Sequence, residues 1–254
     1  MPELQNTLYN LRQLEDLAQG NTWVHALHPL VKLLATLCYI VAVVSFQRDE
    51  ILMLLPFVLY PWLMFALGEI PAGPILRKLI LVSPFVISIG IMNPIFDRTP
   101  VEVAGIILAH GWLTFGSILI KSGLTLSASL LLIATSGLDQ LAQSLRMLRV
   151  PKIFVLQLLL TYRYLSVLLE ELARMLRAYG LRAPGQRGVR REAWGPFVGQ
   201  LLLRTMDRAQ RVYQAMLLRG FSGEYHPARI PRMNARDLAY LTLWIFYFLL
   251  ARFL

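Results

Sequence analysis

Four histidines are the first candidates for metal chemistry in this sequence: His25, His28, His110 and His226. His25 and His28 are three residues apart, so on a helix their side chains would share a face. Two imidazoles without a carboxylate or thiolate as third ligand make a poor metal site. The one cysteine, Cys38, lies in an apolar stretch, which excludes an intrachain disulfide and a cysteine zinc cluster. The sequence therefore predicts no metal site in this chain.

Motifs for catalysis or nucleotide binding are missing from the sequence. It holds no H-E-x-x-H zinc motif, no G-x-S-x-G nucleophile motif and no G-x-x-x-x-G-K-[ST] phosphate loop. No acidic residue lies well inside an apolar stretch, which argues against a proton-relay carrier. Lys121 is the single charge in the longest apolar stretch, and we expect it to have a buried or interfacial structural role. We predict a protein that is not an enzyme, with no catalytic residues and no cofactor.

Two arginines close to glycines could bind an acidic group on another protein. Arg182 follows Gly180, and Arg219 precedes Gly220. A cation at a helix C-terminus is favoured by the helix macrodipole, which by itself is a sufficient reason for both positions. The rigid fork of a guanidinium also suits recognition of a carboxylate on a partner. Position alone leaves both interpretations open.

Amphipathic helices are predicted immediately before both arginines, because apolar residues recur there at helical spacing. The first stripe consists of Leu165, Leu168, Leu169, Leu172, Met175, Leu176 and Tyr179. Its helix is predicted to stop at Gly180, before a loop that reaches Gly188. The second stripe consists of Val198, Leu202, Met206, Ala209, Tyr213 and Met216. Its helix is predicted to begin at Trp194 and to end at Gly220.

The rest of the chain is too apolar for a soluble domain. Hydrophobic residues make up 56% of the sequence and charged residues only 16%, whereas soluble domains carry roughly 25% charged residues. The stretches with the length and apolar character of membrane-crossing helices are 31–46, 51–68, 79–96, 103–136 and 238–254. The prolines expected to kink or break them are Pro56, Pro61, Pro84 and Pro94. We predict an all-α integral membrane protein with about five transmembrane helices plus cytoplasmic amphipathic coupling helices.

The distribution of positive charge predicts the orientation. Residues 137–232 hold 16 of the 25 Lys and Arg residues, and cytoplasmic segments are enriched in these residues. Arg77 and Lys78 are predicted to lie in a second cytoplasmic turn. We therefore expect a multi-pass protein of the cell inner membrane whose N-terminus and Arg187 loop are cytoplasmic and whose Leu254 is outside. No cleavable signal peptide is expected, because the first 20 residues lack an apolar core.

Two further expectations concern the organisation of the chain. Residues 103–136 allow one long crossing or a re-entrant pair around Gly111 and Gly123. The predicted parts are N-terminal transmembrane helices in 1–136, a coupling-helix region in 137–235 and a C-terminal transmembrane helix in 236–254. The basic region lies between crossings and lacks a nucleic-acid-binding motif, so no nucleic-acid partner is predicted. The lipid bilayer is the partner that the composition itself requires.

Three parts of the sequence resemble one known family. Residues 215–221, Ala-Met-Leu-Leu-Arg-Gly-Phe, resemble the second arginine motif of the transmembrane energising component of energy-coupling-factor transporters. Residues 145–171 and residues 27–34 are also similar to that family, and the nearest branch is the CbiQ family of cobalt and nickel importers. The resemblance covers nearly the whole chain. The family's motifs centre on Ala-Arg-Gly, so Leu218 departs from the pattern, and the first motif keeps only its arginine.

The resemblance implies a subunit that couples ATP hydrolysis in other proteins to transport. Such proteins join two cytoplasmic ABC-type ATPase subunits to a membrane-embedded substrate-capture subunit, and their arginine-bearing helix ends dock into the ATPases. The residues implied in ATPase coupling here are Arg177, Arg182, Ala215, Met216, Arg219 and Gly220. Arg177 is a rival to Arg182 for the first contact. The implied cargo is cobalt or nickel, although vitamin importers share the architecture, and the alternative function is a self-sufficient membrane carrier or enzyme.

Overall fold

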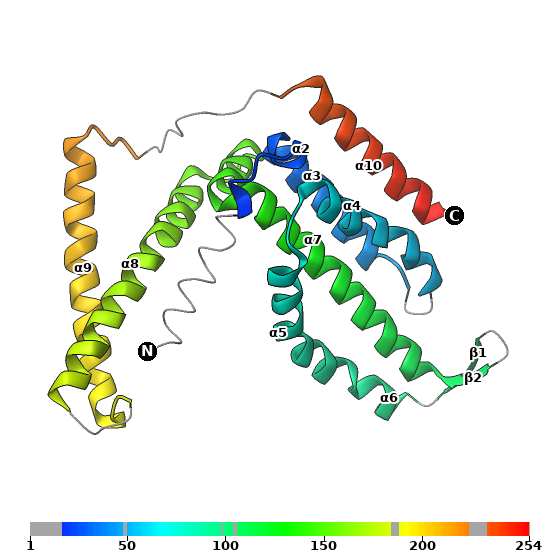
Figure 1. Cartoon of the computed structure of the whole chain (residues 1–254), viewed down its shortest axis with the longest axis horizontal. Helices are drawn as coiled ribbons and strands as arrows, with labels where there is room; N and C mark the ends of the chain where they lie inside the picture. The colour runs from blue at the N-terminus through cyan, green and yellow to red at the C-terminus, as the bar shows by residue number, and fades with distance from the viewer. Residues whose placement is uncertain are drawn as a thin grey trace. The chain divides into compact units, whose positions relative to one another are not determined.

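The computed structural model describes residues 17–47, 50–97, 99–103, 106–183, 188–223 and 233–253, and most of them are helical (Figure 1). The first elements are α2 (Trp23–Ala26), α3 (Pro29–Val44), the 3-10 helix η1 (Leu52–Val58), α4 (Leu59–Gly68), α5 (Ala72–Gly90) and α6 (Met92–Phe96). The strands β1 (Pro100–Val103) and β2 (Ile106–Ala109) follow, and then α7 (His110–Met147), α8 (Lys152–Arg182), the 3-10 helix η2 (Arg191–Ala193), α9 (Trp194–Leu218) and α10 (Ala235–Phe253). The predicted all-α membrane fold is confirmed, with one short antiparallel β pair in addition.

The contacts divide the chain into two compact units. One unit holds α8, η2 and α9. The other holds the elements from α2 to β2, nearly all of α7, and α10. The predicted division at residues 136 and 235 concerns placement relative to a membrane, and it stays a prediction.

An aromatic core joins α3, η1, α4 and α10 in the second unit. The ring of Tyr39 in α3 stacks on Tyr60 in α4, with centroids 4.7 Å apart. Phe248 in α10 lies 5.4 Å from Tyr39 and 5.9 Å from Phe57 in η1. The Tyr39 hydroxyl donates to the carbonyl of Phe57 over 3.0 Å, so a buried polar group finds a partner. These rings attach the last helix of the chain to the first long one.

Lys32 is fully buried in α3 and compensates a break in α7. Gly137 has φ 67° and ψ 163° inside the α7 run, a backbone conformation essentially restricted to glycine. The break leaves carbonyls of the preceding turn without their helical partners. The Lys32 ammonium donates to one of them, the carbonyl of Thr135, over 2.8 Å. A cation at the C-terminal end of a helical segment is also favoured by the macrodipole.

Asp237 links the start of α10 to the start of α3. Its Oδ2 accepts from the backbone N–H of Asn234 over 2.8 Å, which caps its own helix. Its Oδ1 accepts from the backbone N–H of His28 over 2.9 Å. His28 in turn caps α3, because its Nδ1 accepts from the backbone N–H of Leu30. The first turns of two helices that are distant in sequence are thereby held together.

The prolines act as predicted in part of the chain. Pro56 lies inside η1, so the stretch 51–68 is a 3-10 segment followed by α4 rather than one α-helix. Pro94 lies in α6, which follows α5 after Ile91, a residue that keeps helical dihedral angles. Pro84 lies inside α5 without ending it, so of the two predicted effects, a kink or a break, the break does not occur there.

Two predicted boundaries need correction. α5 begins at Ala72, so Arg77 and Lys78 belong to its early turns and not to a connecting turn. Residues 103 and 106–109, predicted to be helical, lie in the β1–β2 pair, where Val101 pairs with Leu108 and Val103 with Ile106. Valine and isoleucine have high strand propensity, and this local preference exceeds the helical expectation drawn from hydropathy alone.

The structure decides between the two interpretations of residues 103–136. α7 runs without interruption from His110 to Gly137, so the re-entrant pair is wrong. Gly111 serves close packing instead, since a Cβ there would lie 2.5 Å from the carbonyl oxygen of Asn93. A Cβ at Gly123 would meet open space. Lys121 has the structural role expected of it, because its Nζ donates to the Phe46 carbonyl over 2.7 Å.

Among the described residues, three helical stretches have the length and apolar composition to cross a membrane: Ala72–Phe96, His110–Met147 and Lys152–Arg182. Pro29–Val44 and Leu52–Gly68 are shorter apolar helices. The third long stretch is α8, which the charge pattern assigns to the cytoplasm. The orientation, with a cytoplasmic N-terminus, therefore stays a prediction, and Arg187 and Leu254 lie outside the described residues.

We predict that α8 lies on the cytoplasmic side and does not cross the membrane. Cysteines at Lys152, the first residue of α8, and at Arg190, eight residues beyond its end, replace exposed residues. Both should then react with an impermeant maleimide from the cytoplasmic side only. The sole native cysteine, Cys38, is exposed and should first be replaced by serine. Labelling of the two positions from opposite sides would show that α8 is a crossing.

We also predict that Lys32→Met destabilises the unit that holds α3 and α7 by about 1.5–3 kcal/mol, because the buried carbonyl of Thr135 loses a charged donor. The measurement is the free energy of unfolding in detergent. Lys121→Met is the matched control, since its half-buried carbonyl partners can bond to water instead. Equal losses in both variants would contradict the capping role of Lys32.

Candidate functional site

The candidate site lies in the unit formed by α8 and α9, where Glu171 holds the two helices together. Its Oε1 accepts from Nη1 of Arg204 in α9 over 2.6 Å. Its Oε2 accepts from Nη2 of Arg174, one turn along α8, over 2.5 Å. Isolated surface ion pairs contribute about 0–1 kcal/mol, and networks contribute more. The pairing fixes α9 beside α8.

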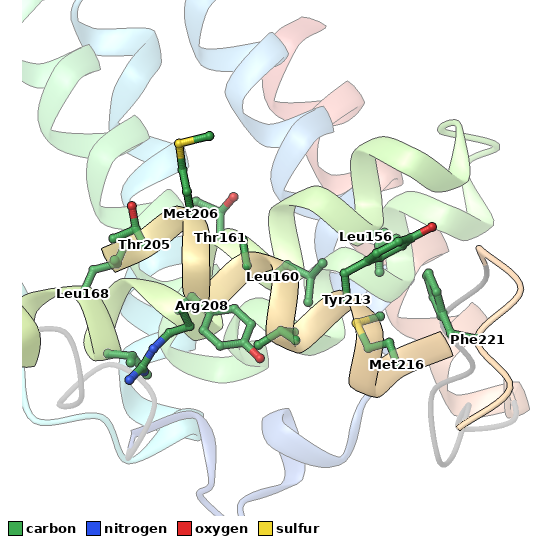
Figure 2. Close-up of a pocket in the computed structure, with 14 residues that line it drawn as sticks. Leu156, Leu160, Thr161, Leu168, Thr205, Met206, Arg208, Tyr213, Met216 and Phe221 are labelled. Carbon is green, nitrogen blue, oxygen red and sulfur yellow. The ribbon is translucent and has the colours of Figure 1, made fainter. Parts of the chain in front are cut away.

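An apolar groove of about 520 Å³ separates the same two helices (Figure 2). α8 contributes residues at helical spacing from Leu156 to Leu168, and α9 contributes residues from Thr205 to Met216. The predicted stripe of α9 lines it through Met206, Ala209, Tyr213 and Met216, whereas only Leu168 of the predicted α8 stripe takes part. The two apolar stripes therefore do not form one closed core, and an open apolar surface remains between the helices.

The end of α9 is fixed by a Schellman motif. The N–H of Phe221 donates to the carbonyl of Met216 over 3.0 Å, and the N–H of Gly220 donates to that of Leu217 over 2.9 Å. Gly220 has φ +80°, the left-handed conformation that this motif requires and that glycine adopts most easily. Phe221 and Met216 both line the groove, which gives the motif its apolar contact. The predicted stop at Gly220 is confirmed, and Arg219 occupies the cap position.

The end of α8 differs from its prediction. The helix continues through Gly180 to Arg182, because the N–H of Ala183 still donates to the carbonyl of Tyr179 over 3.0 Å. Glycine in a helix interior costs only about 1 kcal/mol relative to alanine. Gly180 is therefore an ordinary helical residue, and Arg182 is the last residue of the helix rather than the second residue after it.

The two helix ends repeat the same pattern: a leucine lies three positions after an alanine, and an arginine directly follows the leucine. The repeated residues are Ala178, Leu181 and Arg182 in α8 and Ala215, Leu218 and Arg219 in α9. All six are exposed, and the residue after each alanine, Tyr179 or Met216, is half-buried. In this alignment Arg177 corresponds to Gln214. The pattern is visible in the sequence, but the glycine-centred prediction missed it.

Both arginines are available to a partner. Arg182 and Arg219 are exposed, and within the described part of the chain no hydrogen bond or ion pair joins either guanidinium to another group. Among the other predicted coupling residues, Arg177, Ala215 and Gly220 are exposed and Met216 is half-buried in the groove. The structure thus places the predicted residues in or beside the last two turns of α8 and α9.

The histidines have structural contacts in this structure. His25 bonds through Nδ1 to the Thr22 hydroxyl over 2.7 Å and through Nε2 to the Leu17 carbonyl over 3.0 Å. His110 lies 3.9 Å from a carboxylate oxygen of Asp97. His226 is outside the described residues, and among those described no group of three or more His, Cys, Asp or Glu side chains could hold a metal.

Comparisons with known proteins give consistent similarities. Residues 20–229 match the CbiQ family, which is described as cobalt transport protein. The chain is 26% identical over 222 residues to the energy-coupling factor transporter transmembrane protein EcfT of Listeria innocua, covering 80% of this chain and 82% of the relative. It is 24% identical over 223 residues to an uncharacterized protein of Methanocaldococcus jannaschii, covering 83% of this chain and 75% of the relative.

We predict that Gly220→Ala loosens the end of α9, because an L-residue in the left-handed conformation costs about 1–2 kcal/mol. Hydrogen exchange at the amides of residues 219–221 should become faster. Gly199→Ala is the matched control: a Cβ there meets open space inside the same helix, so the change should stabilise the helix by up to about 1 kcal/mol. Unchanged exchange in Gly220→Ala would mean that another interaction ends the helix.

Proposed function

This chain belongs to the CbiQ family of cobalt transport proteins, and we propose that it is the non-catalytic transmembrane coupling subunit of an ATP-driven energy-coupling-factor importer. In this role it joins two cytoplasmic ABC-type ATPase subunits to a membrane-embedded substrate-capture subunit. The observation that carries the proposal is the pair of helix ends in one unit, each presenting an exposed arginine in the same sequence pattern.

The helix ends suit recognition of acidic groups on the ATPases. Arginine offers five donors in a rigid fork, which can bond a carboxylate through two parallel hydrogen bonds. Arg219 is held at its cap position by the hydrogen bonds that close α9, so its backbone is fixed before docking. Two such ends on two connected helices can engage one ATPase each. Movement of the ATPases would then be transmitted to α8 and α9 through these contacts.

The repeated pattern supports Arg182 over Arg177 as the first contact. Arg182 corresponds to Arg219, whereas Arg177 corresponds to Gln214, which carries no charge. Arg182 is also the final residue of α8, while Arg177 lies more than one turn inside the helix. We assign the first ATPase contact to Arg182, together with its neighbour Leu181.

The apolar groove between α8 and α9 suits contact with the capture subunit. Tyr213 and Met206 are 56% and 54% exposed, which is a large area for a helix face to leave in water. A membrane-embedded partner could cover this face with apolar side chains of its own. We propose cobalt or nickel as the cargo on the description of the family, with the ion bound by the capture subunit. Radioactive cobalt or nickel uptake by the assembled complex would test the cargo separately.

We predict that Arg219→Ala weakens ATPase association by about 3–5 kcal/mol, since it leaves a partner carboxylate buried without its charge. Loss of a favourable helix-end charge alone would cost only about 0.3–1 kcal/mol. The measurement is ATPase recovery with the tagged chain, together with uptake by the complex. Arg219→Lys should restore binding only in part, because lysine lacks the planar fork.

Arg211→Ala is the matched control, an exposed arginine of the same helix away from its end. It should leave ATPase recovery unchanged. A second pair of variants separates the arginines of α8: Arg182→Ala should reduce recovery and Arg177→Ala should not. Full ATPase binding and uptake in Arg219→Ala would refute the coupling role and would favour a self-sufficient carrier.

A further inference from the structure

Two leucines at the helix ends are almost fully exposed in the described part of the chain. Leu181 is 85% exposed and Leu218 is 90% exposed, the highest values for large apolar side chains in the described part of the α8–α9 unit. Neither belongs to the apolar stripe of its helix, and neither lines the groove. A single exposed leucine carries no information, because apolar atoms form much of any protein surface. Here, however, the exposed leucine occurs twice, each time directly before an exposed arginine.

The surroundings of the two leucines are equivalent. In each helix an exposed alanine, Ala178 or Ala215, precedes the leucine by three positions. Residues three apart lie on the same side of a helix. Each leucine therefore rises beside a small side chain, and another protein surface can approach its flank closely. Leu218 stands where the Ala-Arg-Gly pattern has alanine, and a leucine, Leu181, also stands at the corresponding position of α8.

From this repetition we infer that each helix end docks through two groups, the guanidinium to a carboxylate and the adjacent leucine into an apolar pocket of the same ATPase groove. The inference rests on the proposed function, because it takes the ATPase as the partner. Consecutive residues in a helix are about 100° apart around the axis, so the two side chains leave the helix end in different directions. The groove must therefore surround the end rather than contact one face of it.

The chemistry of the pair explains why a leucine would stand next to the arginine. An ion pair is weak in water and becomes much stronger where water is excluded. Contacts that surround a central charged pair and keep water away are a usual feature of strong binding sites. A leucine buried beside Arg182 or Arg219 would supply such a contact, whereas alanine or a polar residue would leave the pair wetter.

The test is Leu218→Ala in the complete complex, with ATPase affinity measured on the purified membrane subunit in detergent. Burial of a leucine predicts about tenfold to hundredfold weaker binding. The thermal stability of the isolated subunit should not fall, since the side chain is 90% exposed and alanine favours helix. Leu218→Ile should retain most of the affinity. Leu181→Ala should behave like Leu218→Ala.

Leu203→Ala is the matched control, an exposed leucine of α9 (59%) far from its end; it should leave the affinity unchanged. If Arg219→Ala weakens ATPase binding and Leu218→Ala does not, the apolar pocket is refuted while the coupling function stands. If neither variant weakens binding, the coupling function itself fails. If Leu218→Ala keeps the ATPases but loses the capture subunit, the leucine contacts a different partner and the inference is overturned.

Discussion

The unit that holds α3, α7 and α10 depends on one buried ammonium group, that of Lys32. α7 is the longest helix described, and it is broken at Gly137, directly after the buried residues Thr135 and Ser136. An unpaired carbonyl in such a place is costly, since no solvent replaces the lost hydrogen bond. Lys32 bonds to the carbonyl at the break from a different helix, so the break in α7 and the position of α3 are parts of one interaction. Asp237 then fixes the start of α10 to the start of α3, and the aromatic core fills the space between them.

The unit of α8 and α9 is organised in the opposite way, with its polar contacts on the surface and its apolar face open. Glu171 bonds both helices, and the groove beside it is lined by apolar side chains that no residue of the unit covers completely. A fold with this much uncovered apolar surface is incomplete as an isolated object. The family to which the chain belongs gives the reason, because its members are transporter components that work in assemblies.

Sequence analysis predicted the elements better than their limits. Hydropathy and spacing located nearly every long helix, and the glycine signal located the end of α9. The same signal failed at Gly180, which lies inside α8. Glycine ends a helix only where its backbone turns to positive φ, as at Gly220. Nothing in the sequence shows that Gly220 makes this turn and Gly180 does not. Hydropathy also could not detect the β pair after α6 or the break at Gly137. The role of Lys32 depends on the break in a helix about a hundred residues away, a distance that no local pattern covers.

The closed end of α9 has a consequence for the thermodynamics of assembly. Ordering a flexible residue on binding costs roughly 1–2 kcal/mol of conformational entropy. At α9 the two hydrogen bonds of Gly220 and Phe221 have already fixed that backbone, whereas at the end of α8 the N–H of Ala183 bonds to the carbonyl of Tyr179 and Ala183 leaves the helical conformation with φ −124° and ψ 66°. The same leucine–arginine pair is therefore attached to helix ends that are closed in different ways. The end of α9 is preorganised for its partner, so docking there requires little further ordering of the backbone.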